Sequence, residues 1–214
     1  MIRLYSFFLF ILLFPFSSYS QFEGTISYAV TYEALERNKQ EMLSMLPNKS
    51  VLYLKEEMSL FEQEVAGGGR QAFIIDAQKG SGILVMQFLG QGYKVEMSQE
   101  EIESLKKTEE LNIVKTDELK TIAGFPCKKV LALTSSDTLE VFYTESLKSK
   151  SSFPPFAKIA GIPLQYELVR GGIKMKYTAM EVNETSLDGS LFTSAPAMKS
   201  MEFEDFARSF AISQ

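Results

Sequence analysis

The sequence predicts a mainly β protein with one antiparallel sheet of about nine or ten strands and a few short helices. Two patterns in the 214 residues lead to this fold class. Large apolar residues alternate with small or polar ones in many segments, as in antiparallel strands that bury one face, whereas buried parallel strands are apolar throughout. Glycine clusters and a Ser-Asp pair separate these segments at the spacing of hairpins.

Strands are predicted wherever the alternation continues. Alternating segments span residues 26–32, 93–97, 139–143, 162–168 and 173–179, and turns are expected at 67–69, 80–82, 90–92, 136–137 and 171–172. In the last strand, Met175 and Tyr177 should face the core beside the preceding strand. Lys174 and Lys176 occupy the intervening positions and should face water, so Lys176→Asp is expected to be nearly neutral.

Three segments lack this alternation and are predicted to be helical. Residues 33–46 contain no Gly or Pro and end before Pro47, with an apolar side made of Ala34, Leu35, Met42, Met45 and Leu46. Ser98 precedes two acidic residues and Ile102, as an N-cap does, which predicts a helix near 99–107. Residues 153–160 are expected to form one further short helix after two prolines.

The N-terminus has the order of a secretory signal. Arg3 precedes an apolar run from Leu4 to Phe16, and small residues follow up to Ser20. The run is shorter than the roughly 20 residues of a membrane span, although a retained anchor is the alternative. We therefore expect residues 1–20 to be a cleaved signal peptide and residues 21–214 to form a single domain. This domain should be exported to the periplasm or cell surface. It should carry no lipid anchor, because no Cys directly follows the apolar run at the expected cleavage site.

The composition excludes many kinds of site. The chain has no His and one Cys, which rules out histidine-based catalysis, zinc cages and cysteine-held clusters. Its 27 acidic and 22 basic residues give a net charge of −5, which disfavours nucleic acid as a partner. We expect no catalytic residue, no metal site and no cofactor.

Two residue types could still carry function. Cys127 is predicted to be a buried, reduced and inert strand residue, and the alternative is a reactive or partner-pairing thiol. The chain also contains ten methionines, several of them at predicted inward positions. Because Met is unbranched and polarizable, these side chains either fill the core or line a groove for an alkyl chain.

Short motifs, taken in order, resemble a family of secreted proteins of unknown function from Gram-negative bacteria, related to the periplasmic outer-membrane lipoprotein-carrier half-barrel. The motifs are residues 22–28, 45–55, 73–76, 120–129, 161–167, 177–182 and 191–192. The resemblance implies a strongly bent antiparallel sheet or half-barrel whose concave face is covered by short helices. It also implies that the helix at 33–46 covers the groove.

These expectations together favour a non-enzymatic binding protein that holds a lipid or acyl chain in a concave groove. The expected partner is a hydrophobic small molecule or a lipidated protein. The alternative is a structural or interaction module of the cell envelope whose groove is simply a filled core; an open apolar cavity would favour the first function, and complete packing the second. The expected groove residues are Met45, Tyr93, Met97, Tyr143, Leu164, Tyr166, Met175 and Tyr177.

Overall fold

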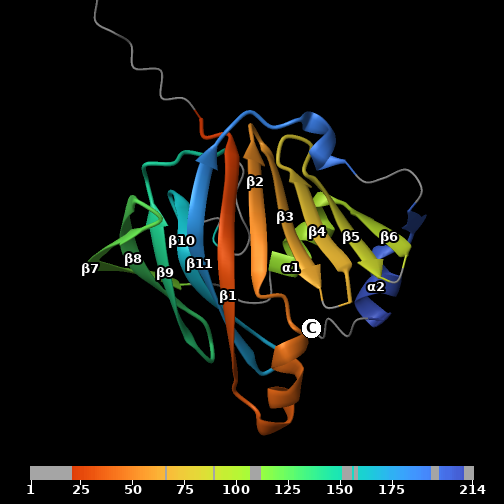
Figure 1. The fold of residues 1–214 in the computed structure, drawn as a ribbon, viewed down its shortest axis with the longest axis horizontal. Coiled ribbons are helices and arrows are strands. Elements are labelled where there is room, and N and C mark those ends of the chain that lie inside the picture. The colour runs from red at the N-terminus through yellow and green to blue at the C-terminus, as the bar shows by residue number, and fades with distance from the viewer. Residues whose placement is uncertain are drawn as a thin grey trace, which may run out of the picture.

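One sheet of 12 strands makes up most of the described chain (Figure 1). The structure is a computed structural model that describes residues 21–214 except 66, 89, 107–111, 151–155, 157–158, 194–197 and 210–214. The strands are β1 (Gly24–Ala34), β2 (Lys49–Lys55), β3 (Met58–Val65), β4 (Gly69–Asp76), β5 (Ser81–Phe88), β6 (Gln91–Met97), β7 (Asn112–Ile122), β8 (Phe125–Leu133), β9 (Thr138–Thr144), β10 (Ile162–Arg170), β11 (Ile173–Glu184) and β12 (Lys199–Ser200). The helical segments are the 3₁₀ helices η1 (Arg37–Met45) and η2 (Gly189–Phe192) and the α-helices α1 (Gln99–Lys106) and α2 (Phe203–Ser209).

The sheet consists of two meanders joined at its centre. The strand order is β12-β6-β5-β4-β3-β2-β1-β11-β10-β9-β8-β7, so β1 and β11 join the meander β1–β6 to the meander β7–β11. All pairings are antiparallel except that of β12 with β6. The prediction of an antiparallel sheet is confirmed, but the predicted number of about nine or ten strands is lower than the 12 observed. The reason is that β7 and β12 are almost entirely exposed, so they have no alternation to detect.

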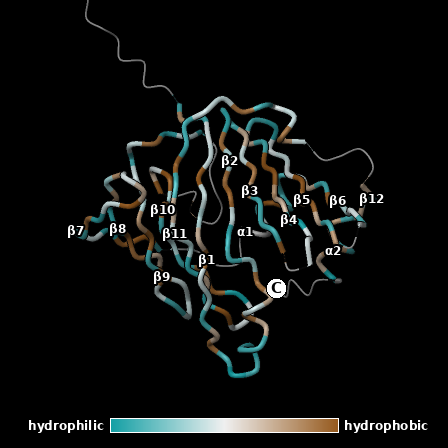
Figure 2. The backbone as a smooth tube through the Cα atoms, in the orientation of Figure 1, coloured by the Kyte–Doolittle hydropathy of each residue, from teal (hydrophilic) through white to brown (hydrophobic). Residues whose placement is uncertain are grey.

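One face of the sheet, here called the inner face, carries a continuous row of apolar side chains. Successive cross-strand partners from β6 to β1 are Val95, Leu84, Phe73, Phe61, Leu52 and Ile26. Directly paired residues lie on the same face, and Figure 2 shows the resulting alternation along the strands. Helix α1 lies behind the sheet in Figure 1 and packs Ile102 on this face beside Leu84 and Val95.

The opposite, outer face differs between its two halves. Over β3–β5 it is apolar, and Leu60, Ile74 and Val85 pack there against Phe192 of η2. Over β10 and β11 it is charged instead. The Glu167 carboxylate, only 9% exposed, lies 3.0 Å from Lys174 Nζ and 3.9 Å from Lys176 Nζ. Both lysines thus face away from the core as predicted, but the expected neutrality of Lys176→Asp must be corrected, because the new carboxylate would lie close to Glu167.

The sheet is open and bent. The pairing register shifts between Ser27 and Tyr28 in β1 and between Pro163 and Gln165 in β10, and a longer shift occurs in β7. Such β-bulges bend the strand and increase its twist. The observed architecture is therefore consistent with the bent sheet that the sequence predicted.

Residues 33–46 are helical only in part, as the 3₁₀ helix η1, and this helix does not cover the groove. Strand β1 extends to Ala34, which pairs with Ile173, and η1 begins only at Arg37. The ladder to β11 therefore replaces the helical pattern only at Glu33 and Ala34. The segment η1 extends below the sheet in Figure 1 and buries none of its residues, and Met45 is 66% exposed.

The other two helix predictions have different outcomes. The helix near 99–107 is confirmed as α1. Most of the helix predicted at 153–160 lies outside the described residues, and so does all of the signal peptide predicted at 1–20. Among the described helices, none is both long and apolar enough to cross a membrane.

Candidate functional site

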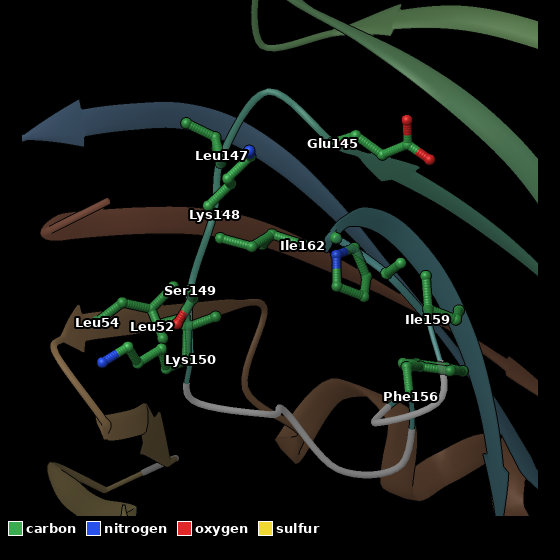
Figure 3. Close-up of a pocket in the computed structure, with 13 residues that line it drawn as sticks. Leu52, Leu54, Glu145, Leu147, Lys148, Ser149, Lys150, Phe156, Ile159 and Ile162 are labelled. Carbon is green, nitrogen blue, oxygen red and sulfur yellow. The ribbon is translucent and has the colours of Figure 1, made fainter. Parts of the chain in front are cut away.

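A cavity of about 600 Å³ opens beside the inner face of β2 (Figure 3). Its apolar wall comes from β2, from the segment that connects β9 to β10, and from the start of β10. The apolar lining residues are Leu52, Leu54, Leu147, Phe156, Ile159, Ala160, Ile162 and Pro163. The remaining lining residues, Glu145, Lys148, Ser149, Lys150 and Gly161, make the rest of the wall more polar. The cavity thus combines an apolar interior with a charged rim.

Backbone hydrogen bonds and one ring contact fix the described parts of the connecting segment. The Phe22 amide donates to the Lys148 carbonyl over 2.8 Å, and the Ile159 amide donates to the Phe156 carbonyl over 2.9 Å. The Phe156 ring packs edge-on against the Tyr166 ring, with 5.3 Å between centroids. These contacts fix the described part of the wall at Lys148, Phe156 and Ile159, and Phe156 is only 2% exposed.

Five of the eight predicted groove residues lie together next to this cavity. Tyr143, Leu164, Tyr166 and Tyr177 are buried in one cluster, and Met175 packs against it. The Tyr166 and Tyr177 rings stack with 4.6 Å between centroids, and the Tyr28 hydroxyl donates to the Pro163 carbonyl over 2.8 Å. These side chains form the packed core behind the cavity, and none of them is among its lining residues.

The other three predicted groove residues lie elsewhere. Met97 is buried under α1 and α2, and Tyr93 packs against the same cluster. Met45 belongs to η1 and is exposed, for the reason given above. Leu147, Phe156 and Ile159 were not predicted as lining residues, because they lie in a connection without alternation. The apolar residues around the two prolines at 154–155 were the available signal.

The charged rim of the cavity is partly neutralised. Glu145 lies 2.7 Å from Lys128 Nζ, and this hydrogen bond lowers the pKa of the Glu145 carboxyl. Lys150 Nζ lies 3.5 Å from a Glu57 oxygen, at the edge of hydrogen-bonding distance. Within the described residues, no group of three or more Asp, Glu or Cys side chains could hold a metal ion.

Cys127 is buried, as predicted. Its side chain is 1% exposed and free of disulfide bonds, and its thiol donates to the Phe125 carbonyl over 3.4 Å. Burial raises the pKa of this thiol, because an apolar environment disfavours the thiolate. The thiol therefore lacks the lowered pKa of a nucleophile at neutral pH.

Comparison with solved structures finds a similar fold in two crystal forms of PNGF-II. They share 17% and 16% sequence identity with this chain, each with a TM-score of 0.55 over 88% of it. The match covers 34% and 33% of those chains, so this chain spans about a third of their length. The lipoprotein LppX of Mycobacterium tuberculosis aligns over 77% of this chain and 89% of its own, at 8% identity and a TM-score of 0.41.

Comparison with curated protein sequences finds no match. Among protein families, the model described as "N-glycanase peptide, N-terminal domain" matches residues 26–202. A relationship to the carrier half-barrel stays a prediction. Because the matched region spans well over half of the sequence, the chain belongs to the family of N-glycanase N-terminal domains.

Proposed function

We propose that this protein is an exported, non-enzymatic binding module that holds a lipid or acyl chain in the cavity between β2 and the β9–β10 connection. One observation carries the proposal: the cavity of about 600 Å³ is walled by Leu52, Leu54, Phe156 and Ile162, while the charged residues that line it, Glu145, Lys148 and Lys150, are all exposed. Its volume is within the range of small-molecule sites. The apolar wall favours a ligand that gains free energy by leaving water, about 25 cal/mol per Å² of apolar surface buried.

The fold supplies rigidity around this cavity. Leu52 and Leu54 are 2% and 1% exposed and belong to a strand paired on both sides. A wall that is ordered before binding reduces the entropy lost when the ligand enters. An acyl chain would lie in the cavity with its polar end at the rim, near Lys148 and Lys150.

Membership of the family sets a context for this role. In PNGF-II the equivalent fold accounts for about a third of the chain. A domain that also occurs as part of a larger protein can act there as an accessory module. We accordingly propose that this domain binds a ligand and catalyses no reaction. The carboxyl group of Glu145 at the rim fits this view. Its ion pair with Lys128 lowers its pKa and keeps it ionised, whereas a general acid would need a raised pKa.

A fluorescence titration with 11-dansylaminoundecanoic acid tests the proposal. The wild-type protein should increase the dansyl emission in a saturable manner, with one site per chain. Ile159→Trp should abolish binding, because the larger side chain fills the cavity from its loop wall. Leu191→Trp is the matched control, because Leu191 lies outside the cavity and is 40% exposed. Equal binding by Ile159→Trp, or no saturable binding by the wild type, would refute the proposal.

A second candidate function is an interaction module that acts through the sheet edge at β7. Strand β7 pairs only with β8 and exposes Leu119 to 74% and Val114 to 40%. An open edge can add a strand from a partner. The bulge between Lys115 and Leu119 interrupts that edge, which is why we rank this function second. Leu119→Lys should abolish capture of a partner if this candidate is correct and leave dansyl binding unchanged.

A further inference from the structure

The rim of the cavity differs in charge from the protein as a whole. Its charged residues, among the described lining residues, are Lys148, Lys150 and Glu145, whereas the whole chain has a net charge of −5. We propose that this rim binds the anionic head group, a carboxylate or a phosphate, of an amphiphile whose alkyl chain occupies the cavity. The inference rests on the proposed function and names the class of its ligand.

Glu145 does not oppose an anion at the rim. Its carboxylate lies 2.7 Å from Lys128 Nζ, and this hydrogen bond lowers the pKa of Glu145 and raises that of Lys128. Both groups therefore stay charged, and the charge of the carboxylate is offset. An anion would meet Lys148 and Lys150 with no uncompensated carboxylate among the described lining residues.

Lys150 can exchange its present partner for a ligand. Its Nζ lies 3.5 Å from the Glu57 carboxylate, and its side chain is 69% exposed. An ammonium group carries three donors and forms stronger hydrogen bonds to an anion at about 2.7–2.9 Å. The backbone of Lys148 is anchored by the Phe22 amide, which donates to its carbonyl over 2.8 Å. Both lysines therefore extend from one short segment whose start is fixed.

There is room for a head group outside the apolar part of the cavity. A second hollow of about 500 Å³ shares Glu145 with the cavity as a lining residue, and Lys128 and Ser146 also line it. Burial of an ionised group among apolar side chains is costly. The head group should therefore stay at the rim, which orients the alkyl chain toward the apolar wall that contains Leu52 and Leu54 (Figure 3).

The same rim disfavours the other kinds of head group. A cationic head group would be repelled by Lys148 and Lys150, and the two nearby carboxylates, Glu145 and Glu57, already face lysines. A neutral head group would gain no attraction from the net charge of the rim. For alkyl chains of equal length, we expect an anionic head group to bind most tightly and a cationic one most weakly.

Isothermal titration at neutral pH with dodecanoate, 1-dodecanol and dodecylamine compares three head groups on one chain length. Dodecanoate should bind about tenfold more tightly than 1-dodecanol, and dodecylamine should bind most weakly. The double substitution Lys148→Gln and Lys150→Gln should remove the advantage of dodecanoate and leave the affinity for 1-dodecanol unchanged. Lys39→Gln with Lys49→Gln is the matched control, because it removes the same charge at two positions outside the cavity.

Two further ligands separate an amphiphile from a free anion. Dodecyl phosphate should bind like dodecanoate, because both carry an anionic head group on the same chain. Acetate lacks the alkyl chain and should not displace dodecanoate at millimolar concentration. Displacement by acetate would assign the rim to free anions and would overturn the inference.

The remaining outcomes distinguish this inference from the acyl-chain proposal. Equal affinity for dodecanoate and 1-dodecanol, or tightest binding of dodecylamine, would overturn the inference and leave the acyl-chain proposal standing. An equal effect of the rim substitutions and the control would do the same. Ile159→Trp should abolish binding of dodecanoate and 1-dodecanol alike, because it fills the cavity itself. Absence of binding by all of these alkyl ligands would overturn both.

Discussion

Met175 and Lys176 are neighbours in β11 whose side chains meet opposite environments. Met175 packs against the core cluster that contains Tyr166 and Tyr177, and Lys176 Nζ lies 3.9 Å from the Glu167 carboxylate. Met175→Asp should lower the free energy of unfolding by about 3 kcal/mol, because it places a carboxylate against the core. Lys176→Asp should cost about 1 kcal/mol through repulsion from Glu167.

Urea denaturation of the two variants measures this difference. Thr31→Asp is a suitable control, because Thr31 is exposed on β1 and pairs with Lys176. If Met175→Asp proved no more destabilising than Lys176→Asp, the register of β11 would have to be reassigned, since a shift of one residue exchanges the two faces.

Cys127 provides a second prediction at the scale of one residue. The native thiol should react slowly with a thiol reagent and should yield one equivalent after unfolding, because burial both hides it and raises its pKa. The raised pKa also implies that this group favours the folded state below the thiol's usual pKa of 9.0 and destabilises it at higher pH. Cys127→Ala should cost about 1 kcal/mol. Rapid labelling of the folded protein would contradict the burial of this thiol.

Helix α1 shows how an element can be predicted from its start signal. The Glu101 carboxylate accepts hydrogen bonds from the Ser98 amide and hydroxyl, both over 2.7 Å, and the Glu101 amide donates to the Ser98 hydroxyl over 3.3 Å. This is a capping box. Ser98→Ala should lower the free energy of unfolding by about 1 kcal/mol at neutral pH, and Ser104→Ala, later in the same helix, should cost less.

The capping box also predicts a dependence on pH. The hydrogen bonds from Ser98 lower the pKa of Glu101, so its contribution is fully present above the usual carboxyl value of 4.5 and is lost as the pH falls through the lower folded pKa. The difference between wild type and Ser98→Ala should therefore shrink in acid. Thermal unfolding at neutral and acidic pH measures it, and a difference independent of pH would show that Glu101 takes no part in the cap.

The contrast between α1 and η1 explains how far the sequence could predict the fold. α1 has a local start signal at Ser98 and a buried anchor at Ile102, and both are visible in the sequence. Residues 33–46 have a helical pattern, but Ala34 pairs with Ile173, which is far away in sequence. Hydrogen bonds between distant strands cannot be read from a local pattern, and they replaced the start of the helix, whereas Arg37–Met45 became the 3₁₀ helix η1.

The candidate site was less predictable than the fold for a related reason. Alternation identified inward residues such as Leu164 and Tyr166, and the structure places both in the core. Whether an inward residue lines a cavity depends on what covers it. Here the cover is the β9–β10 connection, which contributes Leu147, Phe156 and Ile159 without any periodic signal.

At the scale of the whole molecule, the two meanders and the β9–β10 connection enclose one apolar cavity. β2 from the first meander and β10 from the second both contribute residues to it, among them Leu54 and Ile162. The cavity therefore exists only when the central pairing of β1 with β11 is formed. Binding of an apolar ligand should stabilise the whole sheet, by about 2.7 kcal/mol when the free ligand is at a hundred times its Kd.

Native mass spectrometry of the delipidated protein incubated with oleate tests the central claim most directly. Wild-type protein should carry one oleate per chain, and Leu191→Trp should behave like the wild type. Ile159→Trp should carry none, because its indole occupies the space between the connection and β2. Oleate bound equally to the wild type and to Ile159→Trp, or to neither, would contradict the assignment of this cavity as the ligand site.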